Sequence, residues 1–181
     1  MKFKAVLIIG MPGSGKDEFA IVAREMGIEV VNMGDIVREF TAEMNEPISR
    51  SGEVASLERE RNGKDIWAIR TIKKIKSKLV VIEGIRNTEE IDRFRKDLDV
   101  GLVVGISSGR ETRYNRLLKR GREDDPKNME EFTARENREL SWGIGNVLAT
   151  ADYYICNDLS IEYFRNKVRE FLKEHIDRES S

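Results

Sequence analysis

One short segment constrains the fold of this chain more than any other. An apolar run that ends at Ile9 leads into Gly10-Met11-Pro12-Gly13-Ser14-Gly15-Lys16-Asp17. The segment fits the pattern G-x-x-x-x-G-K, in which glycines turn backbone N–H groups toward phosphate oxygens and the lysine reaches the terminal phosphates. The alternative is a glycine-rich turn with an unrelated lysine, but the motif, its spacing and a helix starting at Lys16 disfavour it. We therefore predict a nucleoside triphosphate site for ATP with Mg²⁺.

Short apolar runs alternate with longer amphipathic stretches along the rest of the chain, which predicts a three-layer α/β/α fold with a five-stranded parallel sheet. The runs show little polar alternation, as is typical of strands buried on both faces. The predicted strands are Phe3–Ile9, Glu29–Asn32, Leu79–Glu83, Gly101–Ser107 and Tyr153–Cys156. The predicted helices start at Lys16 and cover about Gly34–Met44, Ser51–Asn62, Lys64–Lys76, Thr88–Lys96, Arg110–Arg120, Asn128–Leu140 and Ser160–Ile176.

Composition narrows the class of protein. The 181 residues are 39% hydrophobic and 36% charged with a net charge of −1, which excludes a disordered chain and gives no overall attraction to nucleic acid or membrane. The longest apolar run, Ala5–Ile9, is too short to span a bilayer, and no signal-peptide pattern is present. A single cysteine, Cys156, suits a reducing compartment, so we predict a cytoplasmic protein and a buried thiol. The oligomeric state is left open.

Two acidic residues, one in the phosphate loop and one at a predicted strand end, are the expected Mg²⁺ ligands. Asp17 stands where the loop pattern has Ser or Thr, and its carboxylate is also a hard oxygen ligand. Glu83 ends an apolar strand, as the acid that holds Mg²⁺ does in such proteins, and Gly84 and Arg86 follow it. Arg86 could clamp a phosphate. The alternative is an ion pair of Glu83 with Arg86 at a bare surface, which the neighbouring phosphate loop disfavours.

Basic residues are concentrated in Arg110–Arg122. Arg113, Arg116 and Arg120 share one face of a predicted helix, where exposed like charges repel one another unless an anion meets them. Beside a phosphate loop such a cluster suits phosphoryl transfer, because arginines neutralise the charge of the moving group. The rival interpretation is an RNA-binding face, but Asp124-Asp125 and the scarcity of aromatic residues oppose it, so nucleic acid is not a predicted partner.

On the acceptor side, two of these motifs resemble the adenylate kinase-like nucleoside monophosphate kinases. Gly34-Asp35-Ile36-Val37-Arg38 is similar to the helix that holds the acceptor nucleotide, with Arg38 on its phosphate. Glu83-Gly84-Ile85-Arg86 is similar to the DG-F-P-R turn of those enzymes, although it is one residue shorter and has Glu for Asp. Met33 and Glu90 stand where adenylate kinases place Thr and Gln near the base. An ionised carboxylate accepts but does not donate, so Glu90 cannot pair both edges of adenine as an amide can.

Further motifs resemble the ATP side of these enzymes, and with them the resemblance covers nearly the whole chain. Arg116-Leu117-Leu118-Lys119-Arg120 has the R-x-x-x-R spacing that precedes the lid and faces ATP. Arg122-Glu123-Asp124-Asp125 is similar to the R-x-D-D after the lid, and Arg135 to the arginine on the helix that follows. Ala151–Asp158, which contains Asn157, is closer to the final strand of dephospho-CoA kinase. Taken together, the motifs look most like archaeal proteins described only as adenylate kinase-related.

The resemblance implies a strand order of 2-3-1-4-5 in one kinase-like domain at residues 1–176, with a tail at 177–181. The acceptor-binding helical part spans about 34–76. The lid is short, at about 120–128, because only Gly121 separates Arg120 from Arg122. The implied catalytic residues are Lys16, Arg86, Arg120, Arg122 and Arg135. ATP contacts come from Gly10–Asp17, Arg116, Arg120 and Asn157, acceptor contacts from Gly34, Arg38, Gly84, Arg86 and Glu90, and metal contacts from Asp17 and Glu83.

Three functions follow from these residues. The leading one is Mg²⁺-dependent transfer of the γ-phosphoryl group of ATP to a nucleoside monophosphate acceptor similar to AMP. The second is a dephospho-CoA kinase-like transfer to a ribose hydroxyl, for which Asp17, Glu83 or Asp35 would supply the base. The third is a slow NTPase or nucleotide-sensing module. Asp17 and the short lid favour a module, whereas arginines on both sides of the loop disfavour it.

Overall fold

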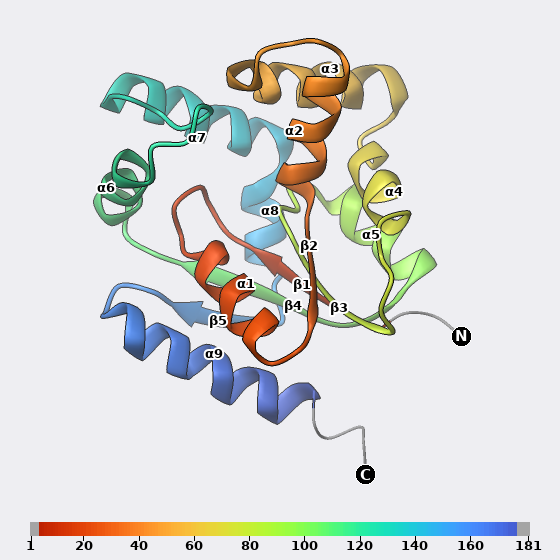
Figure 1. The fold of residues 1–181 in the computed structure, drawn as a ribbon, viewed down its shortest axis with the longest axis vertical. Coiled ribbons are helices and arrows are strands. Elements are labelled where there is room, and N and C mark those ends of the chain that lie inside the picture. Colours follow the sequence, from red (N-terminus) through yellow and green to blue (C-terminus); the bar gives the residue numbers. More distant parts are fainter. Residues whose placement is uncertain (1–3, 177–181) are drawn as a thin grey trace.

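Five parallel strands form the centre of the molecule (Figure 1). The computed structural model describes residues 4–176. The strands are β1 (Lys4–Ile9), β2 (Glu29–Asn32), β3 (Leu79–Glu83), β4 (Asp99–Ser107) and β5 (Tyr153–Cys156). Their order, β2-β3-β1-β4-β5, confirms the predicted topology. β4 begins two residues earlier than predicted because Asp99 and Val100 already pair with Lys4 and Ala5 of β1.

The helices agree with the sequence pattern except at a few boundaries. They are α1 (Lys16–Glu25), α2 (Met33–Glu43), α3 (Ser51–Asn62), α4 (Ile66–Ile72), α5 (Thr88–Asp97), α6 (Arg110–Arg120), α7 (Met129–Trp142), α8 (Ile144–Ala149) and α9 (Ile161–Ile176), with a 3₁₀ turn at Ile48–Arg50. Helix α8 was not predicted. Gly143 separates it from α7 with a φ of +106°, and the buried side chains of Ile144 and Val147 anchor it.

Helix α5 begins at Thr88 as predicted, and Asn87 is its N-cap. Its side-chain oxygen accepts a hydrogen bond from the Glu90 backbone N–H at 2.8 Å. This is the usual N-cap arrangement, which satisfies a donor that the first helical turn leaves free. The helix predicted at Lys64–Lys76 is shorter in the structure, where α4 begins at Ile66. The residues before it form a turn, in which the Ile66 backbone N–H donates to the Gly63 carbonyl.

Two apolar clusters cover the two faces of the sheet. Alternate side chains of β1 point to opposite faces, so Leu7 belongs to one cluster and Ile8 to the other. Helices α2, α4, α5 and α8 pack on the Leu7 face, where Trp67 and Phe94 are fully buried. Helices α1 and α9 pack on the Ile8 face. The central strand is therefore buried on both faces, as its continuous apolar run predicted.

All strands end at the same edge of the sheet because they are parallel. Figure 1 shows α6 and α7 on one side of this edge and α2 with α3 on the other. In open parallel sheets this is the edge where ligands bind. Every polar motif found in the sequence follows a strand and is brought to this edge.

Three expectations concern the periphery of the fold. The predicted burial of Cys156 is wrong: β5 is the last strand of the sheet, its Cys156 side chain is exposed, and the thiol donates to Asp158 Oδ2 at 3.3 Å. Within residues 4–176 no helix is both long and apolar enough to cross a membrane. Phe3 and the predicted tail at 177–181 lie outside the described residues. The cytoplasmic location stays a prediction.

The core packing can be tested at Phe94, which joins α5 to the sheet. Phe94→Ala should lower the free energy of unfolding by about 3–5 kcal/mol, because it removes a fully buried ring and leaves a cavity. Leu159→Ala is the matched control, since the Leu159 side chain is 66% exposed and should change stability by less than about 0.5 kcal/mol. Urea unfolding followed by circular dichroism measures both, and equal effects would contradict the described core.

Candidate functional site

The loop from Gly10 to Asp17 joins β1 to α1, and two of its glycines are required by geometry. Gly13 and Gly15 have φ values of +79° and +111°, which side-chain-bearing residues rarely adopt. Neighbouring atoms also fill the space that a Cβ would need. At Gly15 a Cβ would lie 2.0 Å from Asn157 Nδ2, and at Gly13 it would lie 2.6 Å from the Arg113 carbonyl oxygen. The loop is thus shaped for backbone contact with a ligand.

A cavity of about 430 Å³ opens beside this loop. Its lining is strongly cationic, with eight lysine and arginine side chains against three acidic ones. The cations are Lys16, Arg38, Arg86, Arg116, Lys119, Arg120, Arg122 and Arg135, and the acids are Asp17, Glu18 and Glu83. A concave site with this excess of positive charge, next to a helix N-terminus, is suited to a polyphosphate.

Lys16 folds back onto its own loop. Its ammonium group donates to the carbonyl oxygens of Gly10 at 2.7 Å and Met11 at 3.1 Å. Burial, together with the positive charge of Arg86, lowers the pKa of Lys16 to about 7. A bound phosphate would offer the ammonium stronger acceptors than two neutral carbonyls.

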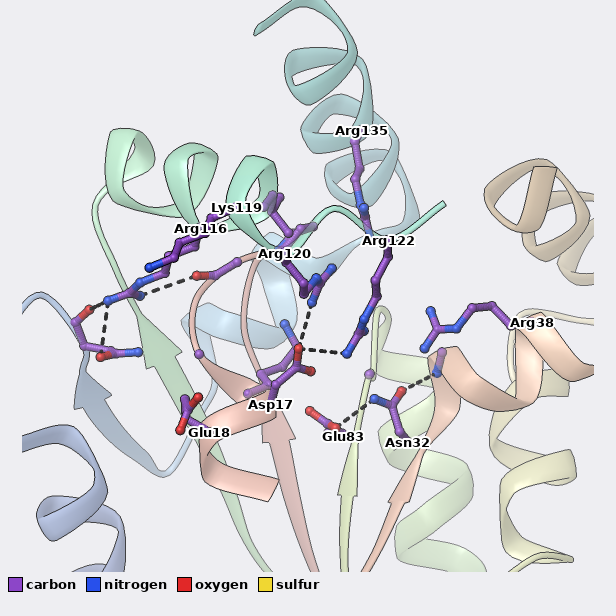
Figure 2. Close-up of a pocket in the computed structure, with 18 of the residues that line it drawn as sticks. Asp17, Glu18, Asn32, Arg38, Glu83, Arg116, Lys119, Arg120, Arg122 and Arg135 are labelled. Atoms are coloured by element: carbon purple, nitrogen blue, oxygen red, sulfur yellow. Dashed lines mark hydrogen bonds and ion pairs between the residues drawn. The ribbon is translucent and has the colours of Figure 1, made fainter. Parts of the chain in front are cut away.

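Asp17 lies at the centre of the cavity and pairs with two arginines (Figure 2). Its Oδ2 accepts from Arg120 Nη1 at 2.8 Å and from Arg122 Nη2 at 3.1 Å. Burial alone would raise the pKa of the Asp17 carboxyl, but these guanidinium groups hold the pKa below its usual range. Asp17 is therefore ionised, and its negative charge occupies the region toward which the arginines converge.

Glu83, at the end of β3, lies on the side of Asp17 that faces away from Arg120 (Figure 2). Its Oε1 accepts from Asn32 Nδ2 at 2.7 Å, and burial raises its pKa although the Lys16 ammonium opposes the shift. Its second oxygen, Oε2, is buried and has no hydrogen-bond partner in the described part of the chain. Asn32 was not predicted as a site residue. Its side chain also caps α2 by accepting from Gly34 N at 2.7 Å, and an Asn between a strand and a helix is the signal that could have revealed it.

These acids fit the chemistry of Mg²⁺. Residues 4–176 contain no cluster of three or more His, Cys, Asp or Glu side chains placed to hold a metal. Mg²⁺ is usually bound by one or two carboxylates together with substrate phosphates and water. Asp17 and Glu83 provide two carboxylates on the cavity wall beside the phosphate loop, and the unpartnered Glu83 Oε2 leaves one oxygen available there.

Arg38 and Arg86 approach the cavity from α2 and from the turn after β3. Arg38 pairs with Asp35 on its own helix and with Asp124 at 3.2 Å. Arg86 pairs through Nε with Glu139 of α7. Both guanidinium groups are thus oriented by carboxylates behind them while they line the cavity. Gly34 and Gly84 lie between them, and a Cβ at Gly84 would come within 3.3 Å of the Gly34 backbone N.

A second set of arginines faces the loop from α6 and α7. Arg120 binds Asp125 through two hydrogen bonds, at 2.8 and 2.6 Å, in addition to its contact with Asp17. Arg135 donates to the Asp124 carbonyl at 2.9 Å and to Asp125 Oδ1 at 3.0 Å. Asp125 therefore ties α6 to α7, and the connecting residues 121–128 hold Arg122 over the loop (Figure 2).

Arg116 and Asn157 meet at the far end of the cavity from Arg38. Arg116 Nη2 donates to the Asn157 carbonyl at 2.8 Å, and Asn157 Nδ2 donates to the Ser14 carbonyl at 2.9 Å. Ile161 is half exposed on the same wall. This end offers an apolar side chain and a guanidinium face rather than paired acids, which suits the nucleoside part of a nucleotide.

The structure corrects the sequence interpretation at two charged residues. Arg113 does not share the exposed face of Arg116, because it is buried and pairs with Glu136 at 2.6 Å. Glu90, expected to contact the acceptor, lines neither of the two cavities at this edge of the sheet. It is 0% exposed, and it accepts from Arg59 Nη2 at 2.9 Å and from the Arg86 backbone N at 2.7 Å. Its placement supports Arg86 from behind.

Three residues of the loop support it without lining the cavity: Gly10, Met11 and Ser14. The first two accept from Lys16, and the Ser14 hydroxyl packs under Gly10, where a Cβ would lie 2.4 Å from Ser14 Oγ. The other members of the predicted site line the cavity, with the exception of Glu90. Glu18, Leu117, Lys119 and Ile161 line it as well and were not predicted.

The chain is similar in sequence to a known family model and to proteins of other organisms. A family model described as an AAA domain matches residues 9–133. A UPF0200 protein of Thermoplasma volcanium is 49% identical over 174 residues, which cover 94% of this chain and 97% of that protein. A UPF0200 protein of Sulfurisphaera tokodaii is 44% identical over 171 residues, which cover 94% of this chain and 96% of its relative.

The solved structures that resemble this chain have much lower sequence identity to it. Shikimate kinase from Acinetobacter baumannii, in complex with shikimate, gives a TM-score of 0.63 at 14% identity and covers 99% of this chain and 96% of that one. Shikimate kinase from Bacteroides thetaiotaomicron gives a TM-score of 0.60 at 14% identity and covers 98% of this chain and 99% of that one. At such identity the likeness shows a shared fold.

The lowered pKa of Lys16 predicts a pH-dependent nucleotide affinity. A bound polyphosphate favours the ammonium form, so the pKa of Lys16 in the complex should lie above its value of about 7 in the free protein. Between these two values binding takes up a proton, and affinity should fall as pH rises above 7, by up to about tenfold per pH unit. Below pH 7 Lys16 is already charged and contributes no slope.

Titration calorimetry with ADP and EDTA, in buffers of different ionisation enthalpy, measures this proton uptake directly. Lys16→Arg is the control, because a guanidinium keeps its charge and should remove the slope between pH 7 and 9. A wild-type protein that binds ADP without taking up a proton at pH 8 would contradict the assignment.

Proposed function

The chain belongs to the UPF0200 family and contains an AAA-type P-loop domain, and from this premise we propose that it is an ATP-dependent phosphotransferase. The observation that carries the proposal is the two-sided arrangement of cations around the phosphate loop. Arg120, Arg122 and Arg135 approach from α6 and α7, and Arg38 and Arg86 approach from the opposite side. A protein that only senses one nucleotide has no need of the second set.

The donor is ATP in this proposal. The backbone of Gly10–Asp17 and the Lys16 ammonium hold its β- and γ-phosphates, and the nucleoside extends toward Arg116, Asn157 and Ile161. Asp17 and Glu83 would hold Mg²⁺, which would neutralise charge on the bound phosphates. Asp17 must then release Arg120 and Arg122, and both guanidinium groups become available to the phosphates. In the free site Asp17 pairs with the two arginines. In the complex Asp17 would pair with Mg²⁺ and the arginines with the phosphates.

The acceptor carries a phosphate that Arg38 and Arg86 hold in line with the γ-phosphorus, as in a nucleoside monophosphate. An acceptor phosphate oxygen forms a bond to the γ-phosphorus while the bond from that phosphorus to the β–γ bridging oxygen breaks, and ADP leaves. The acceptor oxygen is already ionised, so no side chain has to remove a proton. Catalysis consists of positioning and of neutralising charge by the arginines of α6 and α7. Residues 34–76 are the acceptor-binding part and residues 120–128 the lid.

Label transfer from γ-labelled ATP tests this function. The protein is incubated with Mg²⁺ and one of AMP, CMP, UMP, GMP, dephospho-CoA or water alone, and the products are separated. We expect transfer to a monophosphate. Arg38→Ala and Arg86→Ala should each reduce it by about 100-fold, a magnitude typical of a lost group that stabilises developing charge.

Arg95→Ala is the control for these variants, because Arg95 is exposed on α5 and far from the described cavities. Transfer to dephospho-CoA alone would replace the monophosphate by a ribose hydroxyl as acceptor. Label that appears only as free phosphate would exclude the kinase proposal for these acceptors and identify a slow NTPase.

A linked inhibitor separates a two-site kinase from a one-site nucleotide sensor. Two adenosines joined through five phosphates should bind at least about 100-fold more tightly than ATP if both sites are occupied together, because the linkage makes the second contact intramolecular. Isothermal titration calorimetry compares the two ligands. Equal affinity would favour a sensor module.

A further inference from the structure

A second and smaller cavity, of about 90 Å³, lies beside the first. The two cavities share Gly34, Arg38, Gly84, Arg86 and Arg135 in their walls. The smaller one extends away from the phosphate loop, between α3 and α7. An acceptor held by Arg38 and Arg86 therefore has its reacting end in the first cavity and the rest of its structure in the second.

Arg138 of α7 lines this smaller cavity, and its guanidinium group has no acidic or hydrogen-bonding partner among the described residues. Its Nε is buried. The group lies flat against the backbone of α3, where a Cβ at Gly52 would come within 2.6 Å of the Arg138 Cζ. Burial lowers the pKa of Arg138, although the nearby carboxylates of Glu139, Glu53 and Asp124 oppose the shift.

Arg59 of α3 lines the same cavity and is only partly satisfied. It is 8% exposed, and its Nε and Nη2 donate to Glu90 Oε1 at 3.3 and 2.9 Å. Its Nη1 is buried and has no partner in residues 4–176. The guanidinium stacks on Trp142, with Cζ 4.4 Å from the ring centroid, and Arg138 Cζ lies 5.8 Å from the same ring. Trp142 thus holds both guanidinium groups at one end of the cavity.

Buried unpartnered N–H groups on cations are costly, so native proteins rarely keep them without a use. Three acidic side chains are close, and each pairs with another arginine: Glu90 with Arg59, Glu139 with Arg86 and Asp124 with Arg38, although Asp124 Oδ1 forms no hydrogen bond within residues 4–176. None of them pairs with Arg138. The open hydrogen-bonding capacity of Arg59 and Arg138 matches a planar or tetrahedral oxyanion, which arginine binds with paired N–H groups.

The cavity is small for the other obvious occupant, a nucleobase. Its volume of about 90 Å³ is smaller than the ~150 Å³ cavity that is known to hold a benzene molecule, and a base is larger than benzene. Of the two residues expected near a base, Met33 lines the cavity without a polar group to offer, and Glu90 is outside its wall. A carboxylate or a phosphate is compact enough to reach the two arginines.

We infer that the smaller cavity binds a second anionic group of the acceptor, a carboxylate or phosphate, through Arg59 and Arg138. This inference rests on the proposed phosphotransfer and narrows its acceptor to a small phosphate compound with a second anionic group, so that a simple nucleoside monophosphate would be the poorer acceptor. One group lies at Arg38 and Arg86 and receives the phosphoryl group, and the other lies against Trp142. The nucleobase of a simple nucleoside monophosphate does not provide the second group.

Calorimetric titration with matched small acceptors tests the inference, with ADP present to fill the donor site. Glycerol 3-phosphate has one anionic group, 3-phosphoglycerate adds a carboxylate, and glycerol 1,3-bisphosphate adds a phosphate. We expect the compounds with two anionic groups to bind at least tenfold more tightly than glycerol 3-phosphate. The better of the two identifies the anion. Equal affinity for all three, or no binding by any of them, would overturn the inference.

Two variants make the test specific to Arg138. Gly52→Ala places a Cβ where the guanidinium lies and should weaken binding of the preferred compound at least tenfold, while alanine suits a helix better than glycine. Gly145→Ala is the matched control, because its Cβ would meet only Leu140 Cδ2, at 3.7 Å. Arg138→Met removes the charge and should weaken binding similarly while the melting temperature stays equal or rises.

The outcomes separate the inference from the proposed function. A lower melting temperature of Arg138→Met, with unchanged affinity for the compounds that have two anionic groups, would assign Arg138 a structural role and overturn the inference. Efficient transfer to AMP that is insensitive to Gly52→Ala and Arg138→Met would overturn it and leave the kinase proposal intact. Preferential binding of these compounds without any label transfer from ATP would support the anion site and count against the kinase.

Discussion

The guanidinium group of Arg120 joins the phosphate loop to the segment between α6 and α7, with Asp17 at 2.8 Å and Asp125 at 2.6 Å. Arginines from three helices and two connecting segments gather at one edge of the sheet, and like charges this close repel one another in a partly buried site. Asp17, Asp124, Asp125 and Glu139 are interleaved between them. Each carboxylate offsets part of the repulsion between the arginines that the helices bring over the loop.

The ion pairs of Asp17 with Arg120 and Arg122 also determine which ligand can take the place of the carboxylate. Asp17 occupies the region on which Arg120 and Arg122 converge, so its carboxylate holds a position that suits a phosphate oxygen. Pairs of this kind are worth little where solvent screens them, and Asp17 and the two arginines are each partly exposed. A polyphosphate with its cation brings more charge than one carboxylate and can displace it. Asp125, which is almost fully buried, keeps Arg120 in place during such an exchange.

Buried carboxylates behind the acceptor side act differently, because they orient arginines rather than compete for them. Glu139 pairs with Arg86, and Glu90 accepts from the Arg86 backbone and from Arg59. These contacts fix the wall that the two cavities share, and none of these carboxylates forms a hydrogen bond with Arg138. The first cavity has an excess of basic side chains, and Arg138 lies at the far end of the smaller one. This distribution of charge is the basis on which we propose anion binding in the smaller cavity.

The sequence by itself determined the parallel α/β fold and most of the phosphate-loop site, and the resemblance of its motifs to known kinases implied the strand order. The phosphate loop depends on glycine backbone angles and on the start of α1, which are local properties, and strand–helix alternation leaves few topologies for a parallel sheet. Only the tertiary structure decided how the charged side chains pair. Arg113 and Arg116 lie one turn apart on α6, yet one is buried against Glu136 and the other reaches Asn157. Glu90, predicted to contact the acceptor, pairs with Arg59 instead for the same physical reason: a charge is compensated by whatever packs against it, and those partners come from elements far away in the chain.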